Sequence, residues 1–263
     1  MTDWKPDLYT RFEDERTRPA RDLLARCSLP DEGRGAYVVD LGCGPGNSTE
    51  LLAERFVQAA RVEGVDRSPA MLQAARRRLP ACSFVEGDIG SWTPERPVDL
   101  LFTNAALHWV PDHPELLPRL FSLVTPGGLL ALQVPDNLET PAQVAMREVA
   151  SEAPFAALLK GGDPDSDRTP IAPVEDFYDW LAPGAASIEV WHTIYRHPME
   201  SPQAITDWFS STGLKPFVDR LPAEAVTAYL ERYTARIEAL YRRQVDGRRL
   251  LAFPRLFVVA RKA

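Results

Sequence analysis

The sequence predicts an α/β fold in which short parallel strands form one open sheet and helices cover both of its faces. Short apolar runs alternate with stretches of helical periodicity through the first half of the chain. A glycine-rich turn joins the first run to a helix, and several runs end in an acidic residue. The expected strands lie at residues 36–40, 61–65, 83–86, 98–103, 129–134, 187–197 and 250–261.

The composition is that of an ordinary globular protein with one large domain, or one domain with an elaborate insertion. The 263 residues are 45% hydrophobic and 25% charged, which is enough for a full core. The net charge of −7 disfavours nucleic acid and anionic lipid as partners, although local arginines can still bind a small anionic substrate. No apolar run approaches the roughly 20 residues that span a bilayer, and the N-terminus lacks a secretory signal. We therefore expect a cytoplasmic protein.

The cysteines predict neither a disulfide framework nor a metal centre. There are three, Cys27, Cys43 and Cys82, and no C-x-x-C pair occurs. No metal site and no obligate protein partner are expected.

The turn after the first strand is the strongest candidate for a ligand site. The strand ends in Asp40, and Gly42, Gly44 and Gly46 follow at every second position. Without a Cβ the chain can bend through positive φ, and a ligand can lie directly against the main chain. Residues 47–49 are expected to cap the next helix. In a parallel sheet this edge is where ligands bind.

The spacing of these glycines separates two classes of ligand. The dinucleotide fingerprint is G-x-G-x-x-G, whereas here the third glycine comes one residue early. Asp40 would also face a diphosphate, and a cationic ligand tolerates that acid better. The turn therefore disfavours a nucleotide-binding dehydrogenase, while a purely structural turn remains the alternative.

A second acidic residue strengthens the prediction of a cofactor site. Asp66 ends the next strand, 20 residues beyond Gly46, where a carboxylate can accept hydrogen bonds from both ribose hydroxyls. Ser68 is expected to cap a new helix with Pro69 at its first position. The residues assigned to the cofactor at this strand end are Asp66, Arg67, Ser68 and Met71.

The order of these motifs resembles that of the class I S-adenosylmethionine-dependent methyltransferases. The resemblance implies S-adenosyl-L-methionine as cofactor. In that family an acid after the third strand accepts a hydrogen bond from the adenine amino group, and the backbone N–H of the next residue donates to a ring nitrogen. These positions correspond to Asp88 and Ile89. The residues after the fourth strand line the sulfonium, which points to Asn104 and Ala105.

Nearly the whole chain further resembles the trans-aconitate methyltransferases. The matching segments are YTRFEDERTRP (9–19), DLGCGPGNSTELL (40–52), GVDRSPAML (64–72), TNAALHWVPDHPELLPRL (103–120), VPDNLETP (134–141), VWHTIYRHP (190–198) and FPRLFVVA (253–260). The resemblance implies a Rossmann-like, seven-stranded sheet with an antiparallel last strand. It also implies methyl transfer to one carboxylate, which gives a monomethyl ester. A carboxylate is already ionised near neutral pH, so no catalytic general base is expected.

The N-terminal segment is expected to be helical over residues 6–27, with Pro19 opening a second helix. Its aromatic side chains can close over the cofactor, and Tyr9 is assigned to that role. Arg16 is assigned to the cofactor and Arg18 to the substrate, although either could pair with a carboxylate of either molecule.

An acceptor with three carboxylates needs cations and hydrogen-bond donors. His108 and Trp109 follow the fourth motif and are expected to form a pocket wall. Tyr195 and Arg196 lie on the sixth strand and Arg255 on the seventh. Alternation along a strand puts Tyr195 and Arg196 on opposite faces, so these residues cannot all line one pocket.

The chain is expected to divide into a nucleotide-type core and helical additions that form a cap. Residues 1–30 form a helical lid, 31–136 the cofactor-binding core and 137–185 a helical insertion. Residues 186–263 supply the final strands, with a second helical cap insertion at about 198–247. Three other functions remain open: a methyltransferase for a phenol or an amine, a dehydrogenase, and a cofactor-binding protein without catalysis.

Overall fold

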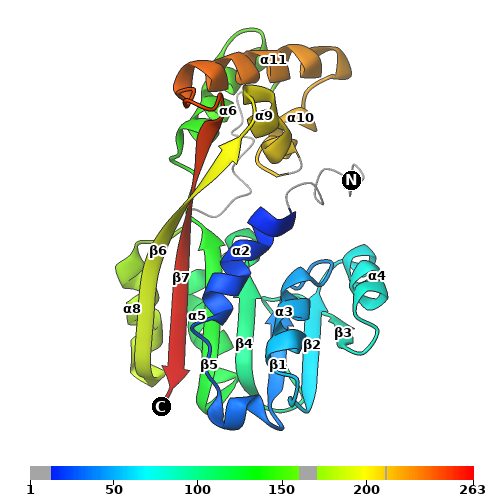
Figure 1. Ribbon diagram of the computed structural model, residues 1–263, viewed down its shortest axis with the longest axis vertical. Coiled ribbons are helices and arrows are strands. Elements are labelled where there is room, and N and C mark those ends of the chain that lie inside the picture. The colour runs from blue at the N-terminus through cyan, green and yellow to red at the C-terminus, as the bar shows by residue number, and fades with distance from the viewer. Residues whose placement is uncertain (1–12, 160–170, 211) are drawn as a thin grey trace. The chain divides into compact units, whose positions relative to one another are not determined.

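The computed structural model describes residues 13–159, 171–210 and 212–263. One seven-stranded sheet runs through the chain in the order β3-β2-β1-β4-β5-β7-β6 (Figure 1). The strands are β1 (Tyr37–Leu41), β2 (Arg61–Asp66), β3 (Ser83–Glu86), β4 (Val98–Asn104), β5 (Val124–Pro135), β6 (Ala185–Met199) and β7 (Arg249–Lys262).

Helices follow most of the strands, as the alternating pattern predicts. They are α2 (Glu13–Leu24), α3 (Asn47–Arg55), α4 (Pro69–Arg78), α5 (His113–Ser122), α6 (Pro141–Ser151), α7 (Phe155–Leu158), α8 (Val174–Leu181), α9 (Pro202–Ser210), α10 (Lys215–Val218) and α11 (Ala223–Leu240). Short 3-10 turns are η1 (Pro30–Gly33), η2 (Leu107–Trp109) and η3 (Ala182–Gly184). No helix of the described residues is long and apolar enough to cross a membrane.

The chain divides into two compact units. Among the described residues, the core unit comprises residues 16–135, 171–193 and 255–263. The helical unit comprises residues 13–15, 136–159 and 194–254 apart from residue 211.

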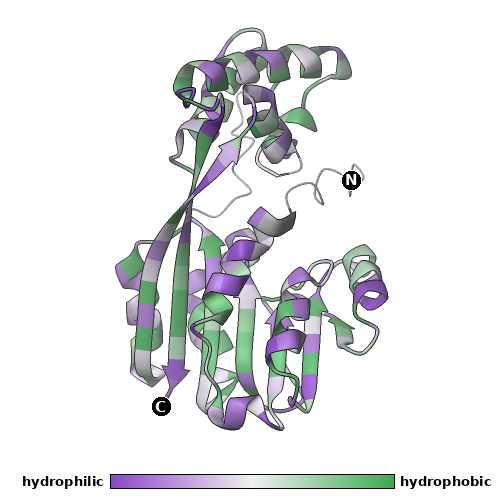
Figure 2. Cartoon of the chain, in the orientation of Figure 1, coloured by the Kyte–Doolittle hydropathy of each residue, from purple (hydrophilic) through white to green (hydrophobic). Residues whose placement is uncertain are grey.

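The core unit has the predicted fold, including its antiparallel last strand. β1 pairs in parallel with β2 and β4, β4 pairs in parallel with β5, and β7 runs antiparallel to β5. Figure 2 shows the hydrophobic character of β4 and β5, the strands that are buried in the middle of the sheet. One face of the sheet packs against α5 and α8. Val39, Leu101 and Leu132 of the strands form one apolar cluster there with Leu117 of α5 and Leu181 of α8.

The opposite sheet face carries polar side chains near the ends of four strands. Asp40 is opposite Phe102 in the register, Asn104 is opposite Gln133, and Gln133 is opposite Phe257. Because side chains alternate along a strand, Asp40, Asn104, Gln133 and Arg255 lie on the same face. Helices α2 and α3 lie in front of the sheet in Figure 1 and α5 lies behind it.

The helical unit has its own apolar core. α11 packs against α6 and α9, so helices from both predicted insertions form one body. The fully buried Tyr229 of α11 packs edge-on against Phe155, and its hydroxyl donates to the Met146 carbonyl at 3.0 Å. Arg236 of α11 forms ion pairs with Glu148 and Glu152.

Three local expectations differ from the structure. Pro19 lies inside α2 and does not open a second helix; burial of Ala20 and Leu23 offsets the hydrogen bond that an internal proline loses. β5 begins at Val124, earlier than the expected strand at 129–134. Residues 125–128 form a bulge within it, because Val124 already pairs with Val98 before Leu129 pairs with Leu100.

Helix α8 lies within the range expected to be the first insertion, yet it packs on α5 in the core unit. Its buried side chains Phe177 and Leu181 explain this, because both join the apolar layer beneath the sheet. The expected boundaries of the lid, the core and the two insertions stay predictions.

Candidate functional site

The turn after β1 is held against β2 by its own backbone. The N–H groups of Gly42 and Cys43 both donate to the Val65 carbonyl, at 2.8 and 3.0 Å. Gly42, Gly44 and Gly46 all have positive φ, of 80°, 52° and 93°, which explains why glycine occupies these positions.

The glycines differ in what surrounds them. A Cβ added to Gly42 would lie 2.4 Å from the Ala106 Cβ, so Gly42 is required for packing. A Cβ added to Gly44 would meet no described atom within 4 Å. The main chain at Gly44 therefore faces open space, as a backbone that receives a ligand must.

Asp40 is fully buried beneath this turn. The hydroxyls of Ser48 and Thr49 donate to its Oδ2 at 2.7 and 2.6 Å, while Oδ1 has no hydrogen-bond partner among the described residues. The expectation that residues 47–49 cap α3 is wrong. Gly46 holds the N-cap position and no side chain caps it, because these hydroxyls bind the buried carboxylate instead.

The surroundings of Asp40 disfavour its charge. Burial raises its pKa to about 6, the nearby Asp66 charge acts in the same direction, and the two hydroxyls oppose the rise. Burial and the charges of Asp40 and Asp66 also raise the pKa of the Cys43 thiol. The two carboxylates therefore give the turn a negative potential, and a bound cation would stabilise their charged forms.

Asp66 is oriented by two backbone groups. The N–H of Gly44 donates to its Oδ2 and the N–H of Ser68 to its Oδ1, each at 2.9 Å. The carboxylate is only partly buried, and each oxygen keeps a second lone pair for another donor. Ser68 caps α4 as predicted, accepting from the Met71 N–H at 3.4 Å, with Pro69 at the first helical position. Arg67 is exposed.

The loop after β3 brings Ile89 to the glycine turn. Its Cδ1 lies 3.2 Å from the Cβ position of Gly42. Asp88 is exposed, and its Oδ1 accepts from the Gly90 N–H at 2.8 Å. The second carboxylate oxygen of Asp88 remains accessible for an amino group.

The end of β4 is strained at a single residue. Ala105 has a φ of 54°, which is unfavourable for a side chain by about 1 kcal/mol, and its N–H donates to the Gln133 carbonyl at 2.9 Å. The preceding Asn104 has a buried Oδ1 without a hydrogen-bond partner among the described residues. An unsatisfied acceptor and a strained backbone at one strand end indicate a ligand position.

Gln133 belongs to this group and was not expected from the sequence. It is fully buried, its Oε1 accepts from the Arg255 guanidinium at 3.2 Å, and its Nε2 has no hydrogen-bond partner in the described part of the chain. The available signal was a polar residue inside the apolar run at 129–134. Arg255 itself is 6% exposed, so its side chain is set firmly into the sheet face.

The remaining core-unit residues of the predicted substrate site are His108, Trp109 and Arg18. His108 is buried on η2, Trp109 beside it is 44% exposed, and their ring centroids lie 4.7 Å apart. Arg18 is exposed on α2.

The other predicted substrate residues are in the helical unit. Tyr195 is buried and stacks on His197 with centroids 6.1 Å apart, whereas the neighbouring Arg196 is exposed. The expected alternation of side chains along β6 is confirmed, because Tyr195 and Arg196 point to opposite faces of the strand. Tyr9 and the side chain of Arg16 lie outside the described residues. The ligand roles of all these residues stay predictions.

Comparison with known proteins decides the family. Residues 38–128 match a family model described as a methyltransferase domain. The chain is 56% identical to the trans-aconitate 2-methyltransferase of Variovorax paradoxus over 263 residues, which is 100% of this chain and 99% of that protein. The chain belongs to the trans-aconitate 2-methyltransferase family.

Solved structures of low sequence identity share the fold of this family member. A putative methyltransferase from Bacillus halodurans has a TM-score of 0.56 and 17% identity, with 93% of this chain and 99% of that chain covered. Phosphoethanolamine N-methyltransferase 2 of Haemonchus contortus, in complex with S-adenosyl-L-methionine, has a TM-score of 0.54 and 16% identity, with 94% and 53% covered. These structures confirm the class I fold alone. Methyl transfer with S-adenosylmethionine as cofactor is confirmed at the level of the family by the full-length relatives and the methyltransferase family model.

The raised pKa of Asp40 makes a prediction about stability. Above a pH of about 6 the buried carboxylate is ionised at a cost, whereas in the unfolded chain it ionises near its usual value of 3.8. Asp40→Asn keeps an oxygen for the Ser48 and Thr49 hydroxyls without the charge. We expect its free energy of unfolding, relative to the parent, to rise by on the order of 1 kcal/mol between pH 5 and pH 7.5.

Urea unfolding of both proteins without ligand, at the two pH values, measures this difference. A difference in stability that stays the same at pH 5 and pH 7.5 would contradict the raised pKa.

Proposed function

We propose that this chain transfers the methyl group of S-adenosyl-L-methionine to one carboxylate of trans-aconitate or a closely related polycarboxylate, giving a monomethyl ester. The observation that carries the proposal is the full-length identity of 56% with a trans-aconitate 2-methyltransferase. The geometry of the β1 turn supports the same reading, because its buried acid and open glycine suit a cationic, phosphate-free cofactor.

The residues around the turn fit the parts of this cofactor. The two oriented oxygens of Asp66 are suited to the ribose hydroxyls, and the Asp88 carboxylate with the Ile89 N–H to the adenine edge. Asp40 and Asn104 each keep a buried oxygen without a partner among the described residues, which suits the positively charged end. Gly42, Gly44 and Gly46 supply the close backbone approach, and Arg67, Ser68, Met71, Ala105, Tyr9 and Arg16 are proposed as further contacts.

The cofactor supplies an electrophilic methyl group, and the protein's own contribution is placement. An ionised carboxylate is itself the nucleophile, so no residue has to remove a proton. Orientation of two reactants contributes roughly 7–11 kcal/mol in well-oriented model reactions. Arginine is the better clamp for the carboxylates that do not react, because its fork binds both oxygens.

For the acceptor we propose contacts from among Arg18, His108, Trp109, Tyr195, Arg196 and Arg255, with Tyr195 and Arg196 as alternatives because they lie on opposite faces of β6. Within the core unit, Arg255 is buried and donates to Gln133, so its guanidinium is held in place. A cytoplasmic location and the lack of an obligate protein partner remain predictions.

The activity is tested with the purified chain, methyl-labelled S-adenosylmethionine, and a panel of di- and tricarboxylates with a phenol and an amine. We expect base-labile label on trans-aconitate. Label on the phenol or the amine alone would assign another acceptor, and cofactor binding without any label would indicate a non-catalytic protein. Tight binding of NAD in place of S-adenosylmethionine would indicate a dehydrogenase.

Removal of the Asp66 carboxylate should weaken cofactor binding strongly. Asp66→Ala removes two charge-assisted hydrogen bonds to the ribose, each worth roughly 1.5–3 kcal/mol, so we expect at least roughly a 100-fold rise in the dissociation constant. Calorimetric titration with S-adenosylmethionine measures it. Glu54→Ala on the exposed end of α3 is the control, and equal affinities of the two variants would refute the assignment.

A methyl group at Gly44 should occupy the ligand's space. Gly44→Ala and the control Gly35→Ala both put alanine at positive φ, and neither Cβ meets a described atom within 4 Å. Each should therefore cost about 1 kcal/mol of stability. Only Gly44→Ala should weaken cofactor binding, by at least tenfold. Parent-like affinity in Gly44→Ala would show that the cofactor does not contact this turn.

A further inference from the structure

Arg119 of α5 contacts the loop after β3, which carries the proposed adenine contacts. This loop spans residues 87–92 and is irregular. The half-buried Arg119 side chain donates through Nη1 to the Trp92 carbonyl at 3.0 Å and through Nη2 to the Ile89 carbonyl. One guanidinium from a neighbouring helix therefore holds two points of the loop backbone.

The charge of Arg119 is directed at these carbonyls. Both of its hydrogen bonds in the described part of the chain go to main-chain oxygens, and no described carboxylate pairs with it. Hydrogen bonds from a charged donor are stronger than neutral ones. Because the guanidinium is planar and its donors have fixed directions, two carbonyls bound to it are held in a defined relative position.

The loop is also tied together by its own backbone. The Asp88 carbonyl accepts from the Ser91 N–H at 3.0 Å and from the Trp92 N–H at 2.7 Å. At the start of the loop, the Gly87 N–H donates to the Asp66 carbonyl at 3.1 Å. A shift of the loop would therefore also affect the strand end that carries the proposed ribose contact.

Apolar packing joins the same loop to α5. Trp92 is buried in one apolar cluster with Leu116 and Leu120 of that helix. A Cβ added to Gly87 would lie 2.8 Å from the Trp92 Cδ1, so the loop already fills its space. Arg119 thus adds directed bonds to a loop that α5 supports through apolar contacts.

The groups that the loop leaves available form a pair of one acceptor and one donor. The Ile89 N–H has no hydrogen-bond partner among the described residues, and the adjacent Asp88 carboxylate is exposed. Adenine offers a 6-amino donor and the N1 acceptor along one edge, which complements this pair. Hypoxanthine, with a 6-oxo acceptor and an N1–H donor, opposes both groups.

We propose that Arg119 is a positioning residue that sets the selectivity of the cofactor site for adenine over a 6-oxo purine. By holding the Ile89 and Trp92 carbonyls, it keeps the Ile89 N–H and the Asp88 carboxylate aligned with one purine edge. Lysine would keep the charge but lacks the planar fork that spans both carbonyls. The inference rests on the proposed function for the assignment of adenine to Asp88 and Ile89.

The test is calorimetric titration of two ligands, S-adenosylhomocysteine and its deaminated analogue S-inosylhomocysteine, into the full chain and its variants. The parent should prefer the adenine ligand by at least roughly 100-fold, because the analogue leaves both protein groups opposed. Arg119→Lys and Arg119→Gln should each lower this preference by at least roughly tenfold. A purely structural role would lower the melting temperature and leave the preference unchanged.

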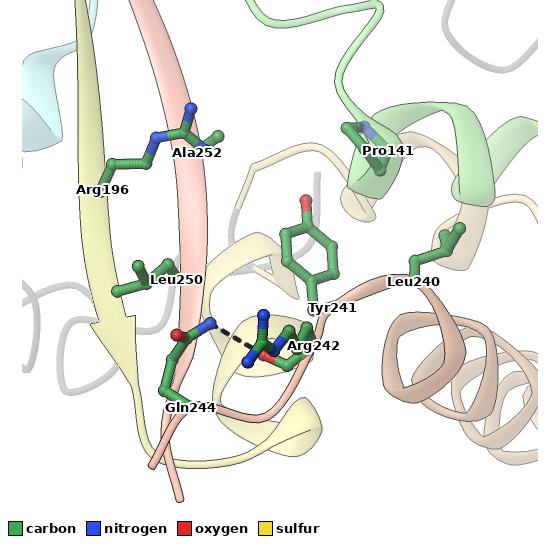
Figure 3. Close-up of a pocket in the computed structure, with 8 residues that line it drawn as sticks. All are labelled: Pro141, Arg196, Leu240, Tyr241, Arg242, Gln244, Leu250 and Ala252. Carbon is green, nitrogen blue, oxygen red and sulfur yellow. Dashed lines mark hydrogen bonds between the residues drawn. The ribbon is translucent and has the colours of Figure 1, made fainter. Parts of the chain in front are cut away.

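Two arginine variants serve as controls. Arg76→Gln is the matched one, because Arg76 of α4 also donates to a backbone carbonyl, that of Phe84 in β3 at 2.8 Å, but outside the loop. Arg242→Gln removes an exposed arginine of the helical unit, where it lines a pocket of about 350 Å³ (Figure 3). Both variants should keep the preference of the parent.

Steady-state kinetics with trans-aconitate separates binding from chemistry. Arg119→Lys should raise the KM for S-adenosylmethionine and leave kcat at saturating cofactor within roughly twofold of the parent, because the purine edge takes no part in methyl transfer. A fall in kcat with an unchanged KM would contradict a role at the adenine edge.

Equal preferences in the parent and both Arg119 variants would overturn the inference, as would an equally large loss in Arg76→Gln. If melting temperatures show that neither Arg119 variant folds, Arg119 is a structural residue and the inference is likewise overturned. A parent that binds both ligands equally would refute the adenine assignment. Methyl transfer with unchanged preference in the Arg119 variants would leave the proposed function standing, whereas a lowered preference without methyl transfer would do the reverse.

Discussion

The burial of one carboxylate determines how the cofactor edge of this protein is built. Asp40 has no exposure at the end of β1, and it holds the start of α3 through the hydroxyls of Ser48 and Thr49. Its charge is costly there, as its raised pKa shows. Buried groups with strongly shifted pKa values are most common at functional sites. A cation bound at the glycine turn above Asp40 would lower the free-energy cost of ionising this carboxylate.

The fold of the core unit was predictable because its signals are local. Each parallel strand is a short apolar run, and the residue at its end, such as Asp66, is next to it in sequence. Pro19 and the bulge in β5 were not predictable in this way. A proline inside α2 is tolerated because of tertiary burial, and Val124 joins β5 because Val98 of the neighbouring strand pairs with it.

In the candidate site, too, residues that lie close together in sequence were predictable, and residues that meet only in the folded chain were not. Gly44, Asp66 and Ser68 form one hydrogen-bonded group, and all three lie in short motifs that the sequence displays. Gln133 and Arg255 lie 122 residues apart and meet only because β7 returns beside β5.

The most direct test of a cationic methyl donor beside a buried acid is the proton balance of cofactor binding. Calorimetry of S-adenosylmethionine binding at pH 6, in two buffers of different ionisation enthalpy, measures this balance. A positive ligand should drive Asp40 to its ionised form, so the parent should release up to about half a proton and Asp40→Asn should release none. Proton uptake, or an equal release from both proteins, would contradict the account.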